Sequence, residues 1–344
     1  MMEKLQLEKL AGRRRRAISV STESLITTSY LQPASPLPLV IQPAVKGLSP
    51  IAWAASNRQL IEEQVMAHGG LLFRGFNIQT ASDFEALIRA IAGDLLEYRE
   101  RSSPRSEVAD HVYTSTDYPA DQSIFLHNEN SYQHTWPLRI FFFCLTPAEQ
   151  GGETPIADCR KIFARIDPRI RQRFIEKRVM YVRNFGEGMG LPWQTVFQTT
   201  DRQVVEKHCQ SVGIKVEWKD NNRLRTRTVR PAVTSHPRTG ELVWFNHATF
   251  FHVTTLPPSI RESMLAEFTE DDLPTNTYYG DGTPIEPSVL DELREIYRQE
   301  TVAFPWEKGD VLMLDNMLAA HGRAPFVGTR KVLVGMTDAT SAGM

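Results

Sequence analysis

Cysteine is scarce in this sequence. Three occur in 344 residues, Cys144, Cys159 and Cys209, and none lies in a CxxC pair. An odd, sparse set of this kind excludes a disulfide framework and predicts reduced thiols in a cytoplasmic protein. Long apolar runs are also missing, because no segment approaches the roughly 20 residues of a membrane span. The N-terminus is charged and lacks the apolar centre of a secretion signal.

An excess of charge of one sign is absent as well. Lys and Arg number 39 and Asp and Glu number 41, so the net charge is −2, and 41% hydrophobic residues is ordinary for a soluble globular protein. This balance predicts neither a nucleic acid nor a membrane surface as partner. The local exception is the run from Arg13 to Arg16. It is interpreted either as a solvated arm or as a docking patch.

Nucleotide-binding signatures are missing too. The sequence has no GxGxxG, no P-loop, no regular alternation of strand and helix patterns and no repeat of solenoid length. These absences exclude the common dinucleotide-binding and P-loop classes.

The first part of the chain predicts an arm and a helical cover. Residues 1–35 are predicted to be an N-terminal arm, and 36–344 a single domain. Within that domain "WAASNRQLIEEQVMAHGG" has helical apolar spacing and stops at Gly69 and Gly70, and "LLFRGF" predicts a short strand. Ser82 and Glu85 form a capping-box pattern that opens a second helix, "SDFEALIRAIAG". Helices on both sides of a strand indicate a cover for a sheet.

From about residue 120 strand patterns dominate. They are β-branched or aromatic and are separated by turns such as "PRTG" and "EKGD". Helical inserts are predicted near 201–211 and 287–299. This pattern predicts a mainly β fold with flanking helices, built on a double-stranded β-helix (jelly-roll, cupin-like) core. The strand candidates are "RIFFFCL", "RVMYVRNF", "IKVEW", "RTRTVRPAVTSH", "ELVWFN", "VLMLDN" and "KVLVGMTD".

His127 and Glu129 in "FLHNENSYQ" are candidate metal ligands. With 9 histidines and 41 acidic residues, such a pair also arises by chance. In an extended segment, however, side chains two positions apart point to the same side. The pair would then offer one imidazole and one carboxylate. A non-haem Fe(II) oxygenase needs a second imidazole on that face, with coordination positions left open.

His321 could be that second imidazole. It follows the strand candidate "VLMLDN" and a loop, and a rolled sheet could bring it beside His127. Arg330, at the start of the next strand candidate, could pair bidentately with a ligand carboxylate. Taken alone, His321 is better explained as a surface-loop histidine, and Arg330 as a solvated cation at a strand edge.

Two long stretches, "LHNENSYQHTWPLRIFFFCLTPAEQGGETPIAD" and "DNMLAAHGRAPFVGTRK", resemble the TauD/TfdA family of Fe(II)- and 2-oxoglutarate-dependent dioxygenases. The closer resemblance is to the SyrP-like branch of natural product pathways, through "LLFRGF", "SSPR", "TSTDYPAD" and "NTYYGDGTPIE". It runs from about residue 37 to the end.

The resemblance implies a set of site residues. His127, Glu129 and His321 would be the iron triad, and Thr154 would hydrogen-bond 2-oxoglutarate. Arg330 would bind the distal carboxylate of 2-oxoglutarate, with Arg323 as the competing arginine. Many relatives carry Asp where this chain has Glu129, although clavaminate-synthase-like members have Glu.

Glu129 also bears on the reaction type. Halogenating relatives have Gly or Ala at this position, so the glutamate implies hydroxylation or a related oxidation with O₂.

Other polar residues are weaker candidates for contact with the substrate. Arg101 and Arg105 in "ERSSPR" could bind a carboxylate or a carrier phosphate, or could lie on a solvent-facing loop. Asn246 and His247 could line the pocket, although a structural role explains His247 better, and His252 better still.

Three functions remain open at the level of the sequence. The first is hydroxylation of an amino acid, or of an aminoacyl group on a carrier protein, in natural product biosynthesis. The second is epoxidation or desaturation by the same iron site. The third is a non-catalytic cupin-like binding protein, which intact ligand and co-substrate positions disfavour.

Overall fold

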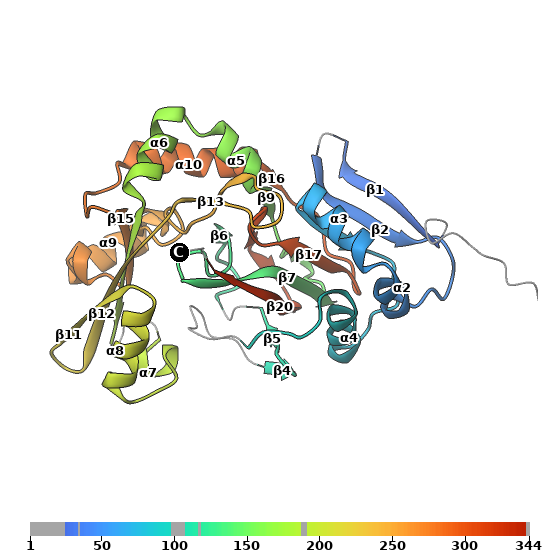
Figure 1. Cartoon of the computed structure of the whole chain (residues 1–344), viewed down its shortest axis with the longest axis horizontal. Coiled ribbons are helices and arrows are strands. Elements are labelled where there is room, and N and C mark those ends of the chain that lie inside the picture. Colours follow the sequence, from blue (N-terminus) through green and yellow to red (C-terminus); the bar gives the residue numbers. More distant parts are fainter. Residues whose placement is uncertain (1–24, 34, 98–106, 116–117, 187–190, 342–344) are drawn as a thin grey trace, which may run out of the picture.

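A large mixed sheet forms one wall of the molecule (Figure 1). In the computed structural model the described residues are 25–33, 35–97, 107–115, 118–186 and 191–341. All pairings in the large sheet are antiparallel except that of β2 with β3. Its strands, in spatial order, are β1 (Ile26–Gln32), β2 (Ser35–Pro43), β3 (Gly70–Phe73), β17 (Val311–Asp315), β7 (Thr135–Thr146), β20 (Lys331–Ser341), β5 (Val112–Thr114) and β4 (Glu107–Ala109).

A smaller sheet faces the large one and completes the predicted jelly-roll core. Its order is β16 (Thr301–Val302), β9 (Ile156–Asp158), β18 (Ala319–Arg323) and β6 (Ile124–His127). Strand β7 shows how the layers form, because its side chains alternate between two apolar clusters. Ile140 and Phe142 pack with Ile156 of the small sheet, whereas Phe141 and Phe143 pack on the opposite side. A strand buried on both faces is continuously apolar, as "IFFFC" is.

Three helices cover the outer face of the large sheet: α2 (Pro50–Ser56), α3 (Arg58–His68) and α4 (Ala81–Ala92). The sequence predicted one helix across 53–68, and the structure corrects this to two. The break lies at Asn57, whose φ of −126° is not helical and whose Nδ2 donates to the Trp53 carbonyl at 2.7 Å. The predicted stop at Gly69 is confirmed, since this residue has φ 78°, a conformation that glycine adopts without steric cost.

The start of α4 differs from the prediction. Thr80, not Ser82, is the N-cap: its Oγ1 accepts from Asp83 N at 3.1 Å, and Asp83 Oδ2 accepts from Thr80 N at 3.0 Å. Ser82 is exposed within the first turn. Both pairs fit the capping-box pattern, and the buried apolar face of the helix selects the earlier one.

The predicted arm is shorter than 35 residues. Strand β1 pairs with β2, from Ile26 opposite Pro43 to Gln32 opposite Ser35. Residues 26–32 therefore belong to the large sheet, and the predicted boundary at residue 35 falls inside a hairpin. The arginine run at 13–16 lies outside the described residues.

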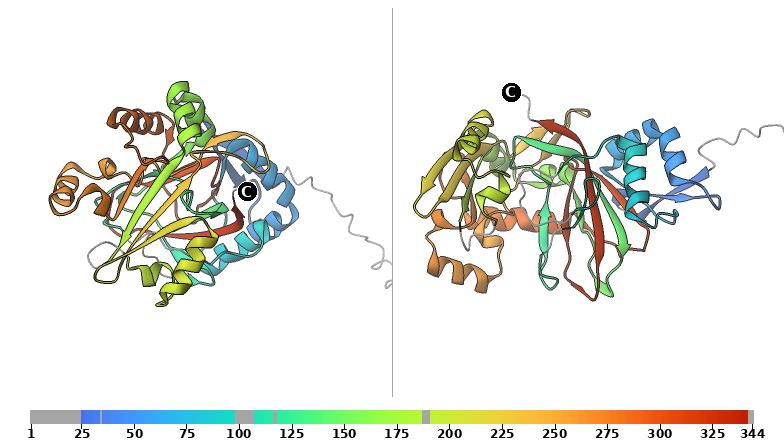
Figure 2. Two further views of the ribbon diagram at one scale, coloured as in Figure 1. Left: turned by 60° about the vertical axis from the view of Figure 1, so that its left-hand side comes forward. Right: turned by 90° about the horizontal axis from the view of Figure 1, so that it is seen from below.

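A third sheet lies at the end of the molecule opposite α2–α4 (Figure 2). The third sheet has the order β11 (Ile214–Lys219), β12 (Arg223–Arg230), β10 (Val179–Phe185) and β15 (Thr275–Tyr279).

The helices predicted near 201–211 and 287–299 are confirmed as α8 (Arg202–Ser211) and α10 (Pro287–Gln299). The remaining elements are β8 (Gln150–Gly151) with β19 (Phe326–Val327), β13 (Val233–Ser235) with β14 (Leu242–Trp244), α5 (Cys159–Arg165), α6 (Pro168–Lys177), α7 (Trp193–Val196), α9 (Pro258–Glu267), and the 3₁₀ turns η2 (Val253–Thr255) and η3 (Glu270–Asp272).

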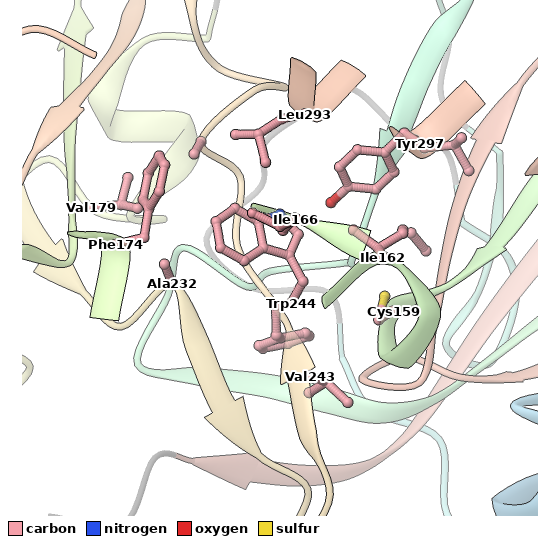
Figure 3. Close-up of a cluster of buried hydrophobic side chains, with 14 of the residues drawn as sticks. Cys159, Ile162, Ile166, Phe174, Val179, Ala232, Val243, Trp244, Leu293 and Tyr297 are labelled. Atoms are coloured by element: carbon pink, nitrogen blue, oxygen red, sulfur yellow. The ribbon is translucent and has the colours of Figure 1, made fainter. Parts of the chain in front are cut away.

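A cluster around Trp244 joins the outer helices to the jelly roll (Figure 3). The Trp244 ring meets Phe174 of α6 edge-on, with ring centroids 5.1 Å apart. Leu293 and Tyr297 of α10 and Ile162 of α5 complete the cluster. Helix α5 follows β9 directly, so this packing fixes the end of β9, the neighbour of β18.

No helix among the described residues is long and apolar enough to cross a membrane. The three cysteines are buried and unbridged, as predicted. Burial raises the pKa of the Cys144 and Cys159 thiols to about 12, so both are protonated at neutral pH.

Candidate active site

Two histidines face each other across neighbouring strands. His321 of β18 is the direct cross-strand partner of His127 in β6, and their ring centroids are 4.6 Å apart. Gly322 allows this approach, because a Cβ there would lie 2.6 Å from the Ile124 carbonyl oxygen. The sequence prediction that a rolled sheet brings the two imidazoles together therefore agrees with the structure.

Glu129 completes the group. It lies in the turn after β6, with 2% of its surface exposed. A ring nitrogen of His127, a ring nitrogen of His321 and a carboxylate oxygen of Glu129 all lie within 4.8 Å of one another. A second grouping with metal-ligand side chains, Glu107, Asp110 and His111, lies at the exposed β4–β5 turn, where such groups are ordinarily solvated.

The tautomer of His127 suits a metal ligand. Its Nδ1 lies 2.9 Å from the Phe125 carbonyl oxygen. A carbonyl can only accept, so Nδ1 carries the proton and Nε2 keeps its lone pair. A ligating histidine is ordinarily oriented by this kind of bond. The Phe250 ring stacks on His127, with centroids 4.5 Å apart.

Asn316 holds the backbone of Glu129, and sequence reasoning did not single it out. Its Oδ1 accepts from Glu129 N at 2.7 Å, and its Nδ2 donates to the carbonyls of Glu129 and Pro137 at 2.9 Å each. Its own carbonyl accepts from Asn128 Nδ2 at 2.7 Å. Asn316 is fully buried. The available signal was "DN" inside the apolar run "VLMLDNML", since a buried amide must find partners.

A small inner pocket extends from the histidines to Arg330. His127, Phe142, Thr154, His321, Arg323 and Arg330 are among its lining residues. The Thr154 hydroxyl oxygen accepts from Trp306 Nε1 at 3.2 Å and from Arg330 at 3.4 Å. Arg330 Nε donates to the Gly152 carbonyl at 2.8 Å. The pocket thus joins the two candidate histidine ligands to the predicted co-substrate residues.

Arg330 is a half-buried cation that forms no ion pair with any described carboxylate. Burial and the nearby charge of Arg323 lower the pKa of Arg330 to about 10, so it remains charged at neutral pH. Arg323 differs, because its guanidinium donates to three backbone carbonyls. Neither arginine has a carboxylate partner among the described residues. The terminal nitrogens of Arg330, however, make only long contacts, to Ser115 Oγ at 3.3 Å and to Thr154 Oγ1 at 3.4 Å, so these are the donors that a ligand carboxylate can take over.

A larger outer cavity of about 650 Å³ opens on the other side of His127. His127 and Glu129 form its inner end. Nine of its sixteen lining residues are aromatic, aliphatic or proline and seven are polar, and such a mixture is compatible with a small-molecule site. The lining residues are Tyr118, Asp121, Gln122, Ser123, Ile124, Phe125, His127, Glu129, His247, Phe250, Phe251, Thr255, Leu256, Pro257, Pro258 and Pro325.

The weaker substrate candidates separate in the structure. His247 lines the outer cavity, whereas Asn246 does not: its Nδ2 donates to the Ala232 carbonyl and its Oδ1 accepts from Ala248 N, each at 2.9 Å. The prediction that Asn246 faces the pocket is therefore wrong, because its amide serves the backbone. His252 caps η2, the structural alternative considered for it. Arg101 and Arg105 lie outside the described residues.

His247 is fixed behind the candidate ligands. Its Nδ1 lies 2.6 Å from Ser131 Oγ, and its backbone N–H donates to the Tyr181 hydroxyl at 2.9 Å. Burial, with smaller effects of His127 and Arg183, lowers the pKa of His247 well below its usual value. Its imidazole is therefore neutral at neutral pH.

Known proteins resemble the chain over most of its length. Dapdiamide synthesis protein DdaC from Enterobacter agglomerans is 41% identical over 278 residues, covering 81% of this chain and 84% of that protein. A clavaminate synthase-like protein from Arabidopsis thaliana is 30% identical over 296 residues, covering 82% and 85%.

The fold also has solved counterparts. PvcB from Pseudomonas aeruginosa superimposes with a TM-score of 0.56 at 16% identity, covering 92% of this chain and 93% of that one. PvcB is described as an Fe, alpha-ketoglutarate dependent oxygenase from an isonitrile synthetic pathway. AAD-2, solved with Mn(II) and N-oxalylglycine, superimposes with a TM-score of 0.55 at 14% identity, covering 93% and 99%. These likenesses confirm the fold.

The family follows from the sequence match. Residues 31–337 match the sequence model of the family described as taurine catabolism dioxygenase TauD, TfdA family. The resemblance found in the sequence is thereby confirmed, and so is the enzyme class that it implied, a dioxygenase that uses Fe(II) and 2-oxoglutarate. The chain belongs to the TauD/TfdA family of dioxygenases.

Proposed function

We propose that this enzyme hydroxylates an unactivated C–H bond of an amino acid, or of an aminoacyl group tethered to a carrier protein, in natural product biosynthesis. The observation that carries the proposal is the convergence of His127, Glu129 and His321 between two pockets of different character. The inner pocket ends at the Arg330 cation, and the outer cavity is more apolar. One pocket suits a small dianion and the other an organic substrate.

The candidate ligands fit Fe(II). Two imidazoles and one carboxylate on one face are the donor set of non-haem iron oxygenases, and they leave coordination positions open. When bound there, Fe(II) with 2-oxoglutarate and O₂ supplies the oxidant that attacks the C–H bond. The tasks left to the chain are to hold the three ligands, to orient the co-substrate and to place one C–H bond at the inner end of the outer cavity.

The inner pocket suits 2-oxoglutarate. The guanidinium of Arg330 offers a bidentate contact to a carboxylate, and the Thr154 hydroxyl lies beside it. Because Arg330 has no carboxylate partner among the described residues, an incoming anion would relieve a buried, uncompensated charge.

The substrate class rests on the relatives and on the cavity. The name of DdaC places that relative in dapdiamide synthesis, and PvcB is assigned to an isonitrile synthetic pathway. The aromatic and proline side chains of the outer cavity offer apolar contact to an organic substrate. Both points support a small amino-acid-derived substrate.

The test is formation of succinate from 2-oxoglutarate by protein loaded with Fe(II), assayed with a panel of free and carrier-bound amino acids. His127→Ala and His321→Ala should each lose Fe(II) binding and turnover together, since two ligands rarely retain Fe(II) where three did. Near-normal succinate formation by either variant would show that the ligand assignment is wrong. His208→Ala is the matched control, because this histidine lies on α8 and lines neither pocket.

Product analysis separates the alternatives. Hydroxylation or epoxidation adds an oxygen atom to the substrate, whereas desaturation removes two hydrogens. A complete absence of succinate, with every substrate and with Fe(II) present, would favour a non-catalytic binding protein.

A further inference from the structure

Arg323 is a buried arginine whose hydrogen bonds go to the backbone of a single loop. It lies on β18, two positions after His321, and 6% of its surface is exposed. Its guanidinium donates to the carbonyls of Tyr118, Pro119 and Gln122 at 2.9, 2.5 and 2.7 Å. Charged donors make the stronger class of hydrogen bond, and a planar fork can serve several acceptors at once.

The loop that Arg323 holds is the rim of the outer cavity. This rim loop, residues 118–123, leads directly into β6, and four of its residues line the cavity: Tyr118, Asp121, Gln122 and Ser123. A second connection lies alongside, because Phe326 N donates to the Ala120 carbonyl at 2.9 Å. Arg323 is itself paired with Ile124, the first residue of β6. The rim loop is thus attached to the strand that carries His321.

Arg323 also borders the inner pocket, where its role differs from that of Arg330. Both side chains line that pocket, and the charge of Arg323 contributes to the lowered pKa of Arg330. The two terminal nitrogens of Arg323 are already engaged by carbonyls that no small anion can replace without opening the loop. The Nε of Arg323 has no hydrogen-bond partner among the described residues, so a carboxylate bound to Arg330 could approach Arg323 there and would leave its three contacts with the loop intact.

We infer that Arg323 is a positioning residue that fixes the rim loop, and that it thereby sets the shape of the outer cavity for the prime substrate without anchoring the co-substrate. The assignment of the two pockets rests on the proposed function, whereas the attachment of the rim loop does not. Loss of the arginine fork should loosen the rim and weaken discrimination among prime substrates, with little effect on the inner pocket.

The matched variants are Arg323→Lys and Arg330→Lys, because lysine keeps the charge of each site and removes only the fork. With Mn(II) present, binding of N-oxalylglycine is titrated and amide hydrogen exchange is followed at Gln122 and Phe326. We expect Arg323→Lys to speed exchange at these amides by about tenfold and to leave the Kd for N-oxalylglycine within about twofold. Arg330→Lys should instead raise the Kd for N-oxalylglycine by about tenfold and leave exchange at these amides within about twofold.

A kinetic split completes the experiment with the substrate found in the succinate assay. Arg323→Lys should raise KM for that substrate by about tenfold with KM for 2-oxoglutarate nearly unchanged. Tyr118→Ser, which removes a ring over the guanidinium, should move exchange and KM in the same direction by less. Unchanged exchange at the rim, or a loss of N-oxalylglycine binding equal to that of Arg330→Lys, would overturn the inference. Failure of the unmodified protein to bind N-oxalylglycine would instead contradict the proposed function, and the exchange measurement would still test the rim loop.

Discussion

At the scale of single residues, the site is decided by what each polar side chain already contacts. Arg323 and Arg330 lie in the same short segment, but their terminal nitrogens differ. Those of Arg323 donate to three carbonyls of one loop, whereas those of Arg330 make only long contacts, at 3.3 and 3.4 Å. Neighbours can differ as sharply: Asn246 serves the backbone, and His247 lines the outer cavity. The hydrogen-bond partners of a polar side chain, more than its residue type, therefore decide whether it can bind a ligand or serves the structure.

Replacing Arg330 tests the co-substrate anchor. Arg330→Ala should raise KM for 2-oxoglutarate far more than KM for the prime substrate. A lost bidentate charged contact is worth roughly 1.5–3 kcal/mol, on the order of tenfold to a hundredfold in affinity. Steady-state kinetics with each substrate varied in turn measure the split. If Arg323→Ala produced this effect and Arg330→Ala did not, the anchor would be Arg323.

Replacing Asn316 tests how far ligand geometry depends on the backbone of Glu129. Asn316→Asp keeps the size and the Oδ1 acceptor but removes the Nδ2 donor to the carbonyls of Glu129 and Pro137. Outer partners of metal ligands typically contribute about tenfold to a hundredfold in affinity, so Mn(II) binding followed by electron paramagnetic resonance should weaken by that order. A folded variant with unaltered metal affinity would show that Asn316 serves stability alone.

At the scale of elements, strands and loops divide the work. Strands β6 and β18 carry the two histidines in fixed register, while the outer cavity is built largely from the rim loop and the segment around η2. Rigid strands suit an iron site, because ligands must stay within a narrow geometry. Loops tolerate change, so they can set substrate choice without disturbing the iron ligands.

The cap of α4 provides a test at this scale. Thr80→Ala should lower the free energy of unfolding by about 1 kcal/mol, because it removes the side-chain acceptor for Asp83 N. Ser82→Ala is the matched control and should be nearly neutral, since Ser82 is exposed and is not the cap. Denaturant unfolding measures both. If Ser82→Ala lowered the free energy of unfolding more than Thr80→Ala does, Ser82 would be the N-cap of α4, as the sequence predicted.

The same cap carries a pH dependence. The hydrogen bond from Thr80 outweighs partial burial and lowers the pKa of Asp83. A carboxyl whose folded pKa is depressed stabilises the fold above its unfolded pKa, and this contribution is lost as pH falls through the folded pKa. The difference between the unmodified protein and Thr80→Ala should therefore shrink in acid.

At the scale of the whole molecule, the net charge of −2 gives no general attraction to an acidic partner. The cations that could provide it, Arg13 to Arg16 and the arginines of "ERSSPR", lie outside the described residues. The proposal of a carrier-bound substrate consequently rests on the resemblance and on local charge.

A carrier-bound aminoacyl thioester is expected to react faster than the same free amino acid, because the tether raises its local concentration and complementary charge speeds encounter. Both forms are assayed side by side at low and high salt, and again with Arg13 to Arg16 replaced by glutamine. Equal or faster turnover of the free form would contradict the tethered substrate. Faster turnover of the carrier-bound form at both salt concentrations would support a tethered substrate but show that the arginines do not bind the carrier protein.

The sequence by itself determined much of this protein. Apolar alternation and turn residues located several strands, among them β7, β17 and β20, but not β6 or β18. Motif resemblance identified the family and the three candidate ligands. These features are local, or depend on short patterns repeated in order. The candidate iron ligands were readable because His127 and Glu129 lie two apart and His321 lies in its own motif.

Only the tertiary structure decided which polar groups remain available for ligands. Asn316 meets Glu129 across 187 positions, and Arg323 reaches the rim loop across about 200. The helix break at Asn57, the cap at Thr80 and the pairing of β1 with β2 likewise became visible only in the structure. The physical reason is that a hydrogen bond or a buried charge depends on which distant atoms folding brings within reach, and short sequence patterns do not encode those distances.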